Sequence, residues 1–177
     1  MDKRYILCLV AIFLVWTSCS LGKKENDKGY IVKVGDPAPE FTINEPDEKS
    51  FKLSDLKGKV VMLQFTASWC SVCRSEMPFI EKEIWQEWKS SDLVVIGIDR
   101  DEPSETVMNF RKDIGVTYPL ALDPGADIFG LFAKKEAGVT RNIIIDRSGK
   151  IVFLTRLFDR TEFDQMKKVI ESELAAK

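Results

Sequence analysis

The chain of 177 residues contains no histidine. Histidine is the commonest general base and the commonest protein ligand of zinc and haem, so its absence excludes serine–histidine and cysteine–histidine catalytic pairs. An excess of one charge is also missing, because 26 Lys and Arg residues are balanced by 28 Asp and Glu residues. We therefore expect no metal, no cofactor and no nucleic-acid partner, and chemistry carried by cysteine, carboxylate, lysine or tyrosine side chains.

Long apolar runs are scarce, and the longest covers residues 5–16, directly after Lys3 and Arg4. Twelve apolar residues are too few to span a bilayer as a helix but are typical of a secretory signal. The ending Thr17-Ser18-Cys19 resembles a bacterial lipoprotein signal, although Trp16 departs from that pattern. We predict a signal peptide over 1–18, cleaved before Cys19, whose sulfur then carries diacylglycerol. The alternatives are cleavage without lipid and, third, an uncut membrane anchor.

The segment that follows the signal is polar and charged, which favours a flexible tether over residues 19–29. Residues 30–177 contain no repeat and no second cluster of proline and glycine, so they predict a single domain. This organisation predicts a lipoprotein anchored in the bacterial cell envelope, with its domain facing the periplasm or the exterior.

The hydrophobic pattern predicts an α/β fold with a mixed sheet. Continuous apolar runs at 60–65, 93–98 and 143–145 indicate strands covered on both faces, and 151–154 would form a hairpin with the third. Segments 41–43 and 50–53 predict an added hairpin. Helical spacing occurs over 77–88, 107–114 and 163–174, with a shorter helix at 127–134 and a capping arrangement at 161–164. The predicted order is ββ, β, α, β, α, α, β, β, α.

The candidate chemistry lies at Cys70 and Cys73, where a predicted strand ends and a helix begins. Unpaired backbone N–H groups and the helix dipole favour an anion there, so the pKa of the Cys70 thiol should fall below that of a free thiol. Two intervening residues place Cys73 one turn later, close enough to form a disulfide. We expect Cys70 to attack a partner disulfide and Cys73 to resolve the mixed disulfide.

Two other functions of a Cys-x-x-Cys pair are less consistent with this sequence. A zinc site needs about four ligands, and the chain has neither histidine nor a second such pair. A purely structural disulfide closing a two-residue loop would constrain the unfolded chain very little.

Four segments resemble the TlpA/ResA group of membrane-tethered thiol-disulfide oxidoreductases, in the thioredoxin superfamily and similar to AhpC/TSA redoxins: Gly35–Phe41, Leu53–Val61, Trp69–Pro78 and Ile145–Ile151. The resemblance implies a thioredoxin-like three-layer α/β/α fold with an added N-terminal hairpin. It also implies that Trp69 contributes to partner docking and that Pro78 kinks the active-site helix. The implied partners are disulfide-containing envelope proteins, with apocytochrome c as a family expectation, and a membrane thiol donor that reduces the pair again.

The sequence departs from that superfamily at two positions. Gln64 stands where thioredoxins often bury a carboxylate, and glutamine cannot be a base, so we expect it to pack in the core. Glu76 is then a candidate proton acceptor for Cys73, although its sequence context favours a solvated surface charge. Thr140 occupies the position of the cis-proline that faces the disulfide. We expect a trans peptide there and a role in substrate docking, the alternative being a locally bonded loop residue.

Two competing functions remain from the sequence. A thiol peroxidase of the peroxiredoxin (AhpC/TSA) type is the first, but its template needs a threonine three residues before the reactive cysteine, where this chain has Ala67. The second is a non-catalytic binding module with a thioredoxin fold, which the presence of both cysteines disfavours.

Overall fold

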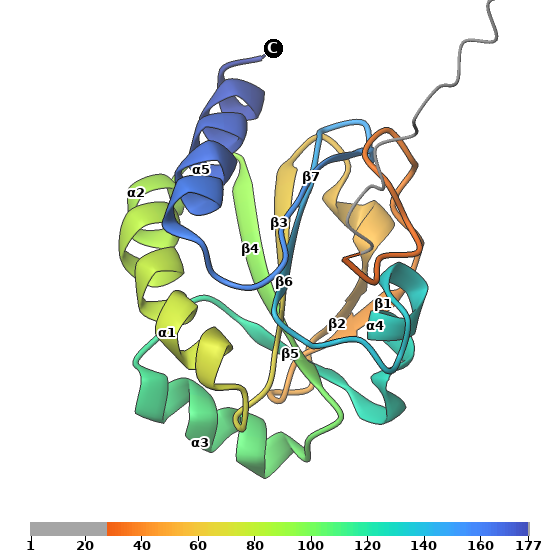
Figure 1. The fold of residues 1–177 in the computed structure, drawn as a ribbon, viewed down its shortest axis with the longest axis vertical. Coiled ribbons are helices and arrows are strands. Elements are labelled where there is room, and N and C mark those ends of the chain that lie inside the picture. The colour runs from red at the N-terminus through yellow and green to blue at the C-terminus, as the bar shows by residue number, and fades with distance from the viewer. Residues whose placement is uncertain (1–27, 177) are drawn as a thin grey trace, which may run out of the picture.

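A computed structural model describes residues 28–176 as a mixed seven-stranded sheet between two helical layers. Helices α1, α2, α3 and α5 cover one face, and α4 lies on the other (Figure 1). The helices are α1 (Ser71–Ile80), α2 (Gln86–Trp88), α3 (Ser104–Ile114), α4 (Asp127–Phe132) and α5 (Arg160–Ala175). The strands are β1 (Thr42–Asn44), β2 (Ser50–Lys52), β3 (Val60–Thr66), β4 (Leu93–Arg100), β5 (Leu120–Asp123), β6 (Arg141–Ile145) and β7 (Ile151–Leu154). The predicted α/β/α fold is confirmed.

The strands lie in the order β2-β1-β5-β4-β3-β6-β7. Strand β3 is parallel to β4, which is parallel to β5, whereas β6 and β7 form an antiparallel hairpin beside β3. Every residue of β3 is buried, as expected for a central strand covered on both faces. The added β1–β2 hairpin also forms, and β1 pairs with β5 at a single position.

Strand β5 is absent from the predicted element order. It has only four residues, and Pro119 stands directly before it. A run this short gives no clear periodicity, and proline usually marks a loop. The strand forms because its backbone pairs with β4 in parallel register, from Gly97 opposite Leu120 to Arg100 opposite Asp123.

The active-site helix continues past Pro78. Ring closure removes the N–H of Pro78, so one helical hydrogen bond is missing. Three residues later the helix widens into a π-helical turn over Glu81–Trp85 and then continues as α2. The apolar positions predicted to share one face do so, because Met77, Ile80 and Ile84 are fully buried.

The central sheet carries the core on both faces. On the α4 face, the Phe65 ring contacts Phe129 and Phe132 at centroid distances of 5.3 and 5.6 Å. On the α1 face, the Thr66 hydroxyl contacts the Met77 sulfur at 3.3 Å. Both faces of β3 are thus packed up to its last residue, Thr66, after which the chain continues toward Cys70.

Lys28, the first residue that the structure describes, already contacts the domain, two residues before the predicted boundary at Tyr30. The Lys28 ammonium pairs with Glu162, and the Lys28 carbonyl accepts a hydrogen bond from Arg141 at 2.6 Å. The predicted signal peptide, Cys19 and tether residues 19–27 lie outside the described residues. Within residues 28–176, no helix is long and apolar enough to cross a membrane.

The N-cap of α5 differs from the sequence prediction, which placed a capping arrangement at 161–164. Asp159 is the cap, and its carboxylate accepts the Glu162 backbone N–H at 2.9 Å. The preceding loop sets this start, because Asp159 has extended backbone angles and Thr161 is already helical.

We expect Asp159→Ala to lower the free energy of unfolding by about 1 kcal/mol, the usual contribution of an N-cap side chain. Thr161→Ala, two residues along the same helix, is the matched control and should leave stability within about 0.5 kcal/mol. Urea denaturation measures both. A larger loss for Thr161→Ala than for Asp159→Ala would contradict the observed cap.

Candidate active site

Cys70 is the N-cap residue of α1, as the sequence predicts for the attacking thiol. Its sulfur accepts the backbone N–H of Cys73 at 3.1 Å, so the first turn of the helix already directs a donor at it. A thiolate at this position would gain from that donor and from the positive end of the helix dipole.

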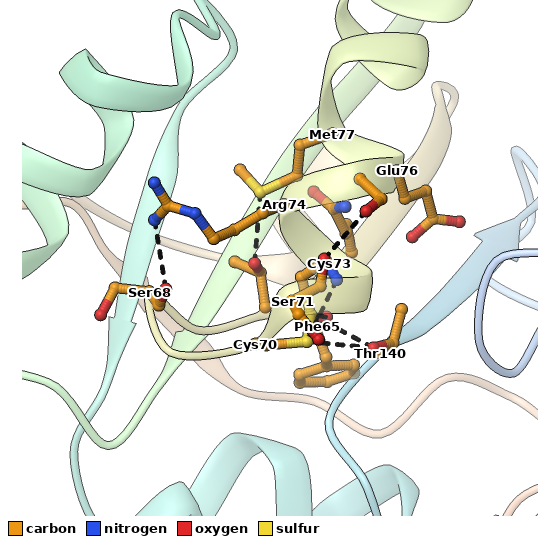
Figure 2. The surroundings of a disulfide bond; sticks show 12 residues. Phe65, Ser68, Cys70, Ser71, Cys73, Arg74, Glu76, Met77 and Thr140 are labelled. Atoms are coloured by element: carbon orange, nitrogen blue, oxygen red, sulfur yellow. Dashed lines mark hydrogen bonds between the residues drawn. A yellow bond between two sulfur atoms is a disulfide. The ribbon is translucent and has the colours of Figure 1, made fainter.

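Cys70 and Cys73 form a disulfide, with their Cα atoms 5.3 Å apart. The two sulfurs differ in exposure, because Cys70 retains 7% of its surface and Cys73 none. Cys73 lies one turn inside α1, and its sulfur is 4.0 Å from the Phe65 carbonyl (Figure 2). This arrangement suits Cys70 as the sulfur that attacks a partner disulfide and Cys73 as the sulfur that resolves the mixed disulfide.

Glu102, which follows β4, fixes the loop that leads to Cys70. Its carboxylate accepts both the backbone N–H of Ser68 and the Ser68 hydroxyl, the latter at 2.6 Å. From the other side, Arg74 donates to the Ser68 carbonyl at 3.2 Å. Asp99 lies on β4, just before Glu102. Burial and the neighbouring Glu102 charge raise the pKa of the Asp99 carboxyl to about 8. Glu102 was not predicted from the sequence, because nothing in its loop indicates a contact 34 residues away.

Thr140 lies against the disulfide. Its hydroxyl oxygen is 3.2 Å from the Cys70 sulfur and 3.3 Å from the Cys73 sulfur (Figure 2). The described residues contain no cis peptide bond, so the expected trans peptide at Thr140 is confirmed. The alternative of a locally bonded loop residue is wrong. The Thr140 hydroxyl contacts the sulfurs of Cys70 and Cys73, which lie 70 and 67 positions earlier in the sequence.

Two exposed apolar side chains, Trp69 and Leu157, lie near the disulfide in sequence or through a direct contact with Thr140. Trp69, predicted to contribute to docking, is 65% exposed. Leu157 is also exposed, and its backbone N–H donates to the Thr140 carbonyl at 3.2 Å. Leu157 lies in the loop between β7 and α5, and no motif in the sequence indicates its position.

Gln64 packs in the core as predicted. It is fully buried, and its side-chain carbonyl accepts the Tyr118 hydroxyl at 2.7 Å. Tyr118 is buried as well, so this hydrogen bond pairs a buried hydroxyl with the buried side-chain carbonyl of Gln64.

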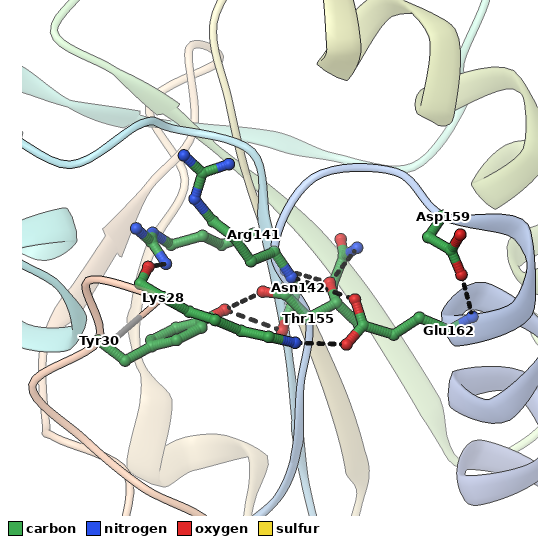
Figure 3. Close-up of polar contacts among 8 residues, drawn as sticks. Lys28, Tyr30, Arg141, Asn142, Thr155, Asp159 and Glu162 are labelled. Carbon is green, nitrogen blue, oxygen red and sulfur yellow. Dashed lines mark hydrogen bonds and ion pairs between the residues drawn. The ribbon is translucent and has the colours of Figure 1, made fainter. Parts of the chain in front are cut away.

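The expectation that Glu76 is a solvated surface charge is wrong. Only 1% of Glu76 is exposed, and its carboxylate accepts the Asn142 side-chain amide at 2.6 Å. The Asn142 side-chain amide also donates to the Thr155 hydroxyl at 3.0 Å (Figure 3). Burial raises the pKa of Glu76 to about 7, although the Asn142 hydrogen bond opposes the shift. The misprediction follows from helix geometry, because Glu76 lies one turn after Cys73, on the side of α1 that faces the sheet.

Arg141 follows Thr140 but points away from the sulfurs. Its guanidinium lies over the Tyr30 ring at 4.5 Å and donates to the Lys28 carbonyl (Figure 3). Arg141 is therefore engaged by the N-terminal segment and not by the cysteine pair. No group of three histidine, cysteine or acidic side chains that could hold a metal ion occurs within residues 28–176.

Comparison with known proteins identifies the same chemistry. The Redoxin family matches residues 33–170. The thiol-disulfide oxidoreductase ResA of Bacillus thuringiensis (strain Al Hakam) is 34% identical over 121 residues, which cover 68% of each chain.

Solved structures agree in fold. A solution structure from Bacteroides thetaiotaomicron, whose protein is provisionally assigned as a protein disulfide isomerase, is 60% identical with a TM-score of 0.80, covering 82% of this chain and 92% of that one. A thiol:disulfide interchange protein of the thioredoxin family from Chlorobium tepidum is 27% identical with a TM-score of 0.67, covering 81% and 99%. The chain therefore belongs to the Redoxin family, and it is a thiol-disulfide oxidoreductase with Cys70 and Cys73 as its Cys-x-x-Cys pair.

Proposed function

We propose that this oxidoreductase is tethered to a membrane through Cys19 and reduces disulfides of envelope proteins. The observation that carries the direction of attack is the asymmetry of the pair, with Cys70 at the helix N-cap beside the exposed Trp69 and Cys73 fully buried. A macromolecular disulfide can reach only the first of these sulfurs.

The exchange is balanced without a cofactor. The Cys70 thiolate attacks one sulfur of the partner disulfide, forms a mixed disulfide, and releases the other partner sulfur as a thiolate, which takes up a proton. Cys73 loses its proton and attacks the Cys70 sulfur, which closes the intramolecular disulfide and releases the second partner thiolate. Two electrons pass from the cysteine pair to the partner, and a membrane thiol donor would return them.

Glu76 is the group we propose as acceptor of the Cys73 proton. It lies one turn further along α1, it is buried behind the disulfide, and its pKa of about 7 permits it to exchange a proton near neutral pH. Asn142 holds the carboxylate in place. Gln64, at the usual position of the acid, cannot perform this task.

The envelope location and the partners rest on the sequence and on the relatives. The leader ends in the lipoprotein-like Thr17-Ser18-Cys19, and the relatives include ResA oxidoreductases. The exposed Trp69 and Leu157 offer apolar surface for docking a protein chain, of which apocytochrome c is one candidate. The Cys70–Cys73 disulfide disfavours the non-catalytic alternative, and Ala67 stands where the peroxidase template needs a threonine.

We expect Cys70→Ala to reduce disulfide reduction to the uncatalysed rate and Cys73→Ser to accumulate a covalent adduct between Cys70 and its partner. The two cysteines differ because only Cys73 can release a partner bound to Cys70. Non-reducing electrophoresis and mass spectrometry of the adduct provide the measurement, and they also identify the partner. Ser71→Ala, which keeps both sulfurs, is the control. Faster alkylation of Cys73 than of Cys70 at mildly acidic pH would show that the roles are reversed.

Glu76→Gln should slow resolution by about 100-fold, the usual contribution of a general base. The measurement uses an aromatic disulfide whose thiolate product is coloured. Attack by Cys70 releases the first equivalent, which the variant should leave within about twofold, whereas attack by Cys73 releases the second. An equal effect on both releases would exclude a specific role in Cys73 deprotonation.

The pH dependence of the free energy of unfolding provides an independent test of the Glu76 pKa. Its folded value of about 7 lies above the ordinary value of 4.5, so the native state keeps a proton that the unfolded chain releases. This carboxyl therefore lowers stability as pH rises from about 4.5 to 7, by about 1.4 kcal/mol per pKa unit of difference. Glu76→Gln should lose that dependence, and the exposed Glu87→Gln should keep it. Parallel curves for wild type and Glu76→Gln in urea denaturation would contradict the assignment.

The tether prediction is tested on the full chain expressed in a bacterial host. We expect the product to begin at Cys19, to carry diacylglycerol, and to partition with membranes, because two acyl chains suffice for stable anchoring. Intact-mass spectrometry of the membrane and soluble fractions checks both statements. A soluble product that begins at another residue would refute the anchor while leaving the redox chemistry intact.

A further inference from the structure

The geometry points to Thr140 as a catalytic residue whose hydroxyl donates a hydrogen bond to the Cys70 thiolate of the reduced protein and thereby promotes attack. The inference deepens the proposed exchange reaction and rests on it. It differs from a docking role, because the side chain would act on the reacting sulfur and not on the partner.

The first support is the position of the hydroxyl. Its oxygen lies within hydrogen-bonding distance of both sulfurs, 3.2 Å from Cys70 and 3.3 Å from Cys73. Disulfide sulfurs carry no proton, so the hydroxyl is the donor in this state. Thr140 is only 3% exposed, which keeps water from competing for that proton.

The second support is that the backbone around Thr140 is fixed before any partner arrives. Its carbonyl accepts the Leu157 N–H, and Arg141, the next residue, pairs with Phe65 in the β3–β6 ladder. The Arg141 side chain is held in turn by the Lys28 carbonyl and the Tyr30 ring. A donor held in this way needs little reorganisation when charge develops on sulfur.

The third support is chemical. A hydroxyl has one proton to donate, and a thiolate is a much stronger acceptor than a disulfide sulfur. Reduction would therefore turn a contact shared between two sulfurs into one directed at the Cys70 thiolate, alongside the Cys73 backbone N–H that already points there. Proline at this position offers no such proton. The substitution that separates this chain from its superfamily thus adds a second donor to the nucleophile.

Thr140→Val tests the inference, because it removes the hydroxyl and keeps the branched shape. A hydrogen bond to a charged group contributes a factor of about ten or more, so the pKa of the Cys70 thiol should rise by about one unit. Alkylation of the reduced protein one pH unit below the wild-type pKa should then be about tenfold slower. Thr140→Ser, which keeps the hydroxyl, should restore the wild-type profile.

The reduction potential provides a second readout with a defined sign. Loss of the donor destabilises the thiolate and hence the reduced state, so Thr140→Val should lower the potential by about 30 mV for a tenfold effect. The difference in reduction potential between Thr140→Val and wild type should be complete above the Cys70 pKa of the variant. It should vanish below the Cys70 pKa of the wild type, where the Cys70 thiol of both proteins is protonated. The neighbouring charged groups are unchanged in these variants: Arg74, Glu76, Glu102 and Arg141.

Thr66→Val is the matched control, since it removes a buried hydroxyl that contacts Met77 and not the disulfide. It should leave the pKa of the Cys70 thiol, measured by alkylation against pH, unchanged. A Cys70 pKa in Thr140→Val within 0.2 pH units of wild type would overturn the inference. So would a Cys70 pKa in Thr140→Ser that is shifted as far as in Thr140→Val. Either result would leave reversible reduction of the pair intact, whereas failure of the proposed function would appear as no reversible reduction in the wild type.

Discussion

The register between β3 and β6 is the constraint on which the active site depends. Phe65 pairs with Arg141 in this antiparallel ladder, so the loop that leaves β3 toward Cys70 meets the residue that precedes β6, which is Thr140. Alternate residues of a strand face opposite sides of the sheet, and a slip by one residue would turn Thr140 away from the sulfurs. The buried β3 residues and the Phe65–Phe129 contact hold this register.

The same ladder also builds the polar region behind the disulfide. Gln64 pairs with Asn142, one residue earlier on β3 and one residue later on β6 than the Phe65–Arg141 pair, and Asn142 holds Glu76 of α1. A polar cluster in a core opposes folding unless its members are bonded, and here the carboxyl responds by shifting its pKa toward neutrality. The carboxyl that is absent from β3 is thus replaced by one that approaches from the helix side. A titratable carboxyl thus lies one helical turn after Cys73, although the strand position is occupied by glutamine.

Most of the fold could be predicted from the sequence, because the long buried strands and the regularly spaced helices give strong local patterns. The same holds for Cys70 and Cys73, whose spacing and position at a strand–helix junction indicate their chemistry. Contacts between distant segments could not be predicted. Burial of Glu76 depends on how α1 rotates against β6, and the contact of Thr140 with both sulfurs depends on strand register. The short strand β5 forms because its backbone pairs with β4 and, at one position, with β1.

The central claim is that Cys70 and Cys73 form a reversible two-electron centre. The direct measurement equilibrates the full chain with dithiothreitol buffers of graded potential, traps free thiols with a maleimide, and locates the label by peptide mass. Both cysteines should become labelled together in one transition with a two-electron slope, and the transition should be the same when approached from the oxidised or the reduced protein. Labelling of one cysteine without the other, or a disulfide that does not re-form, would contradict it.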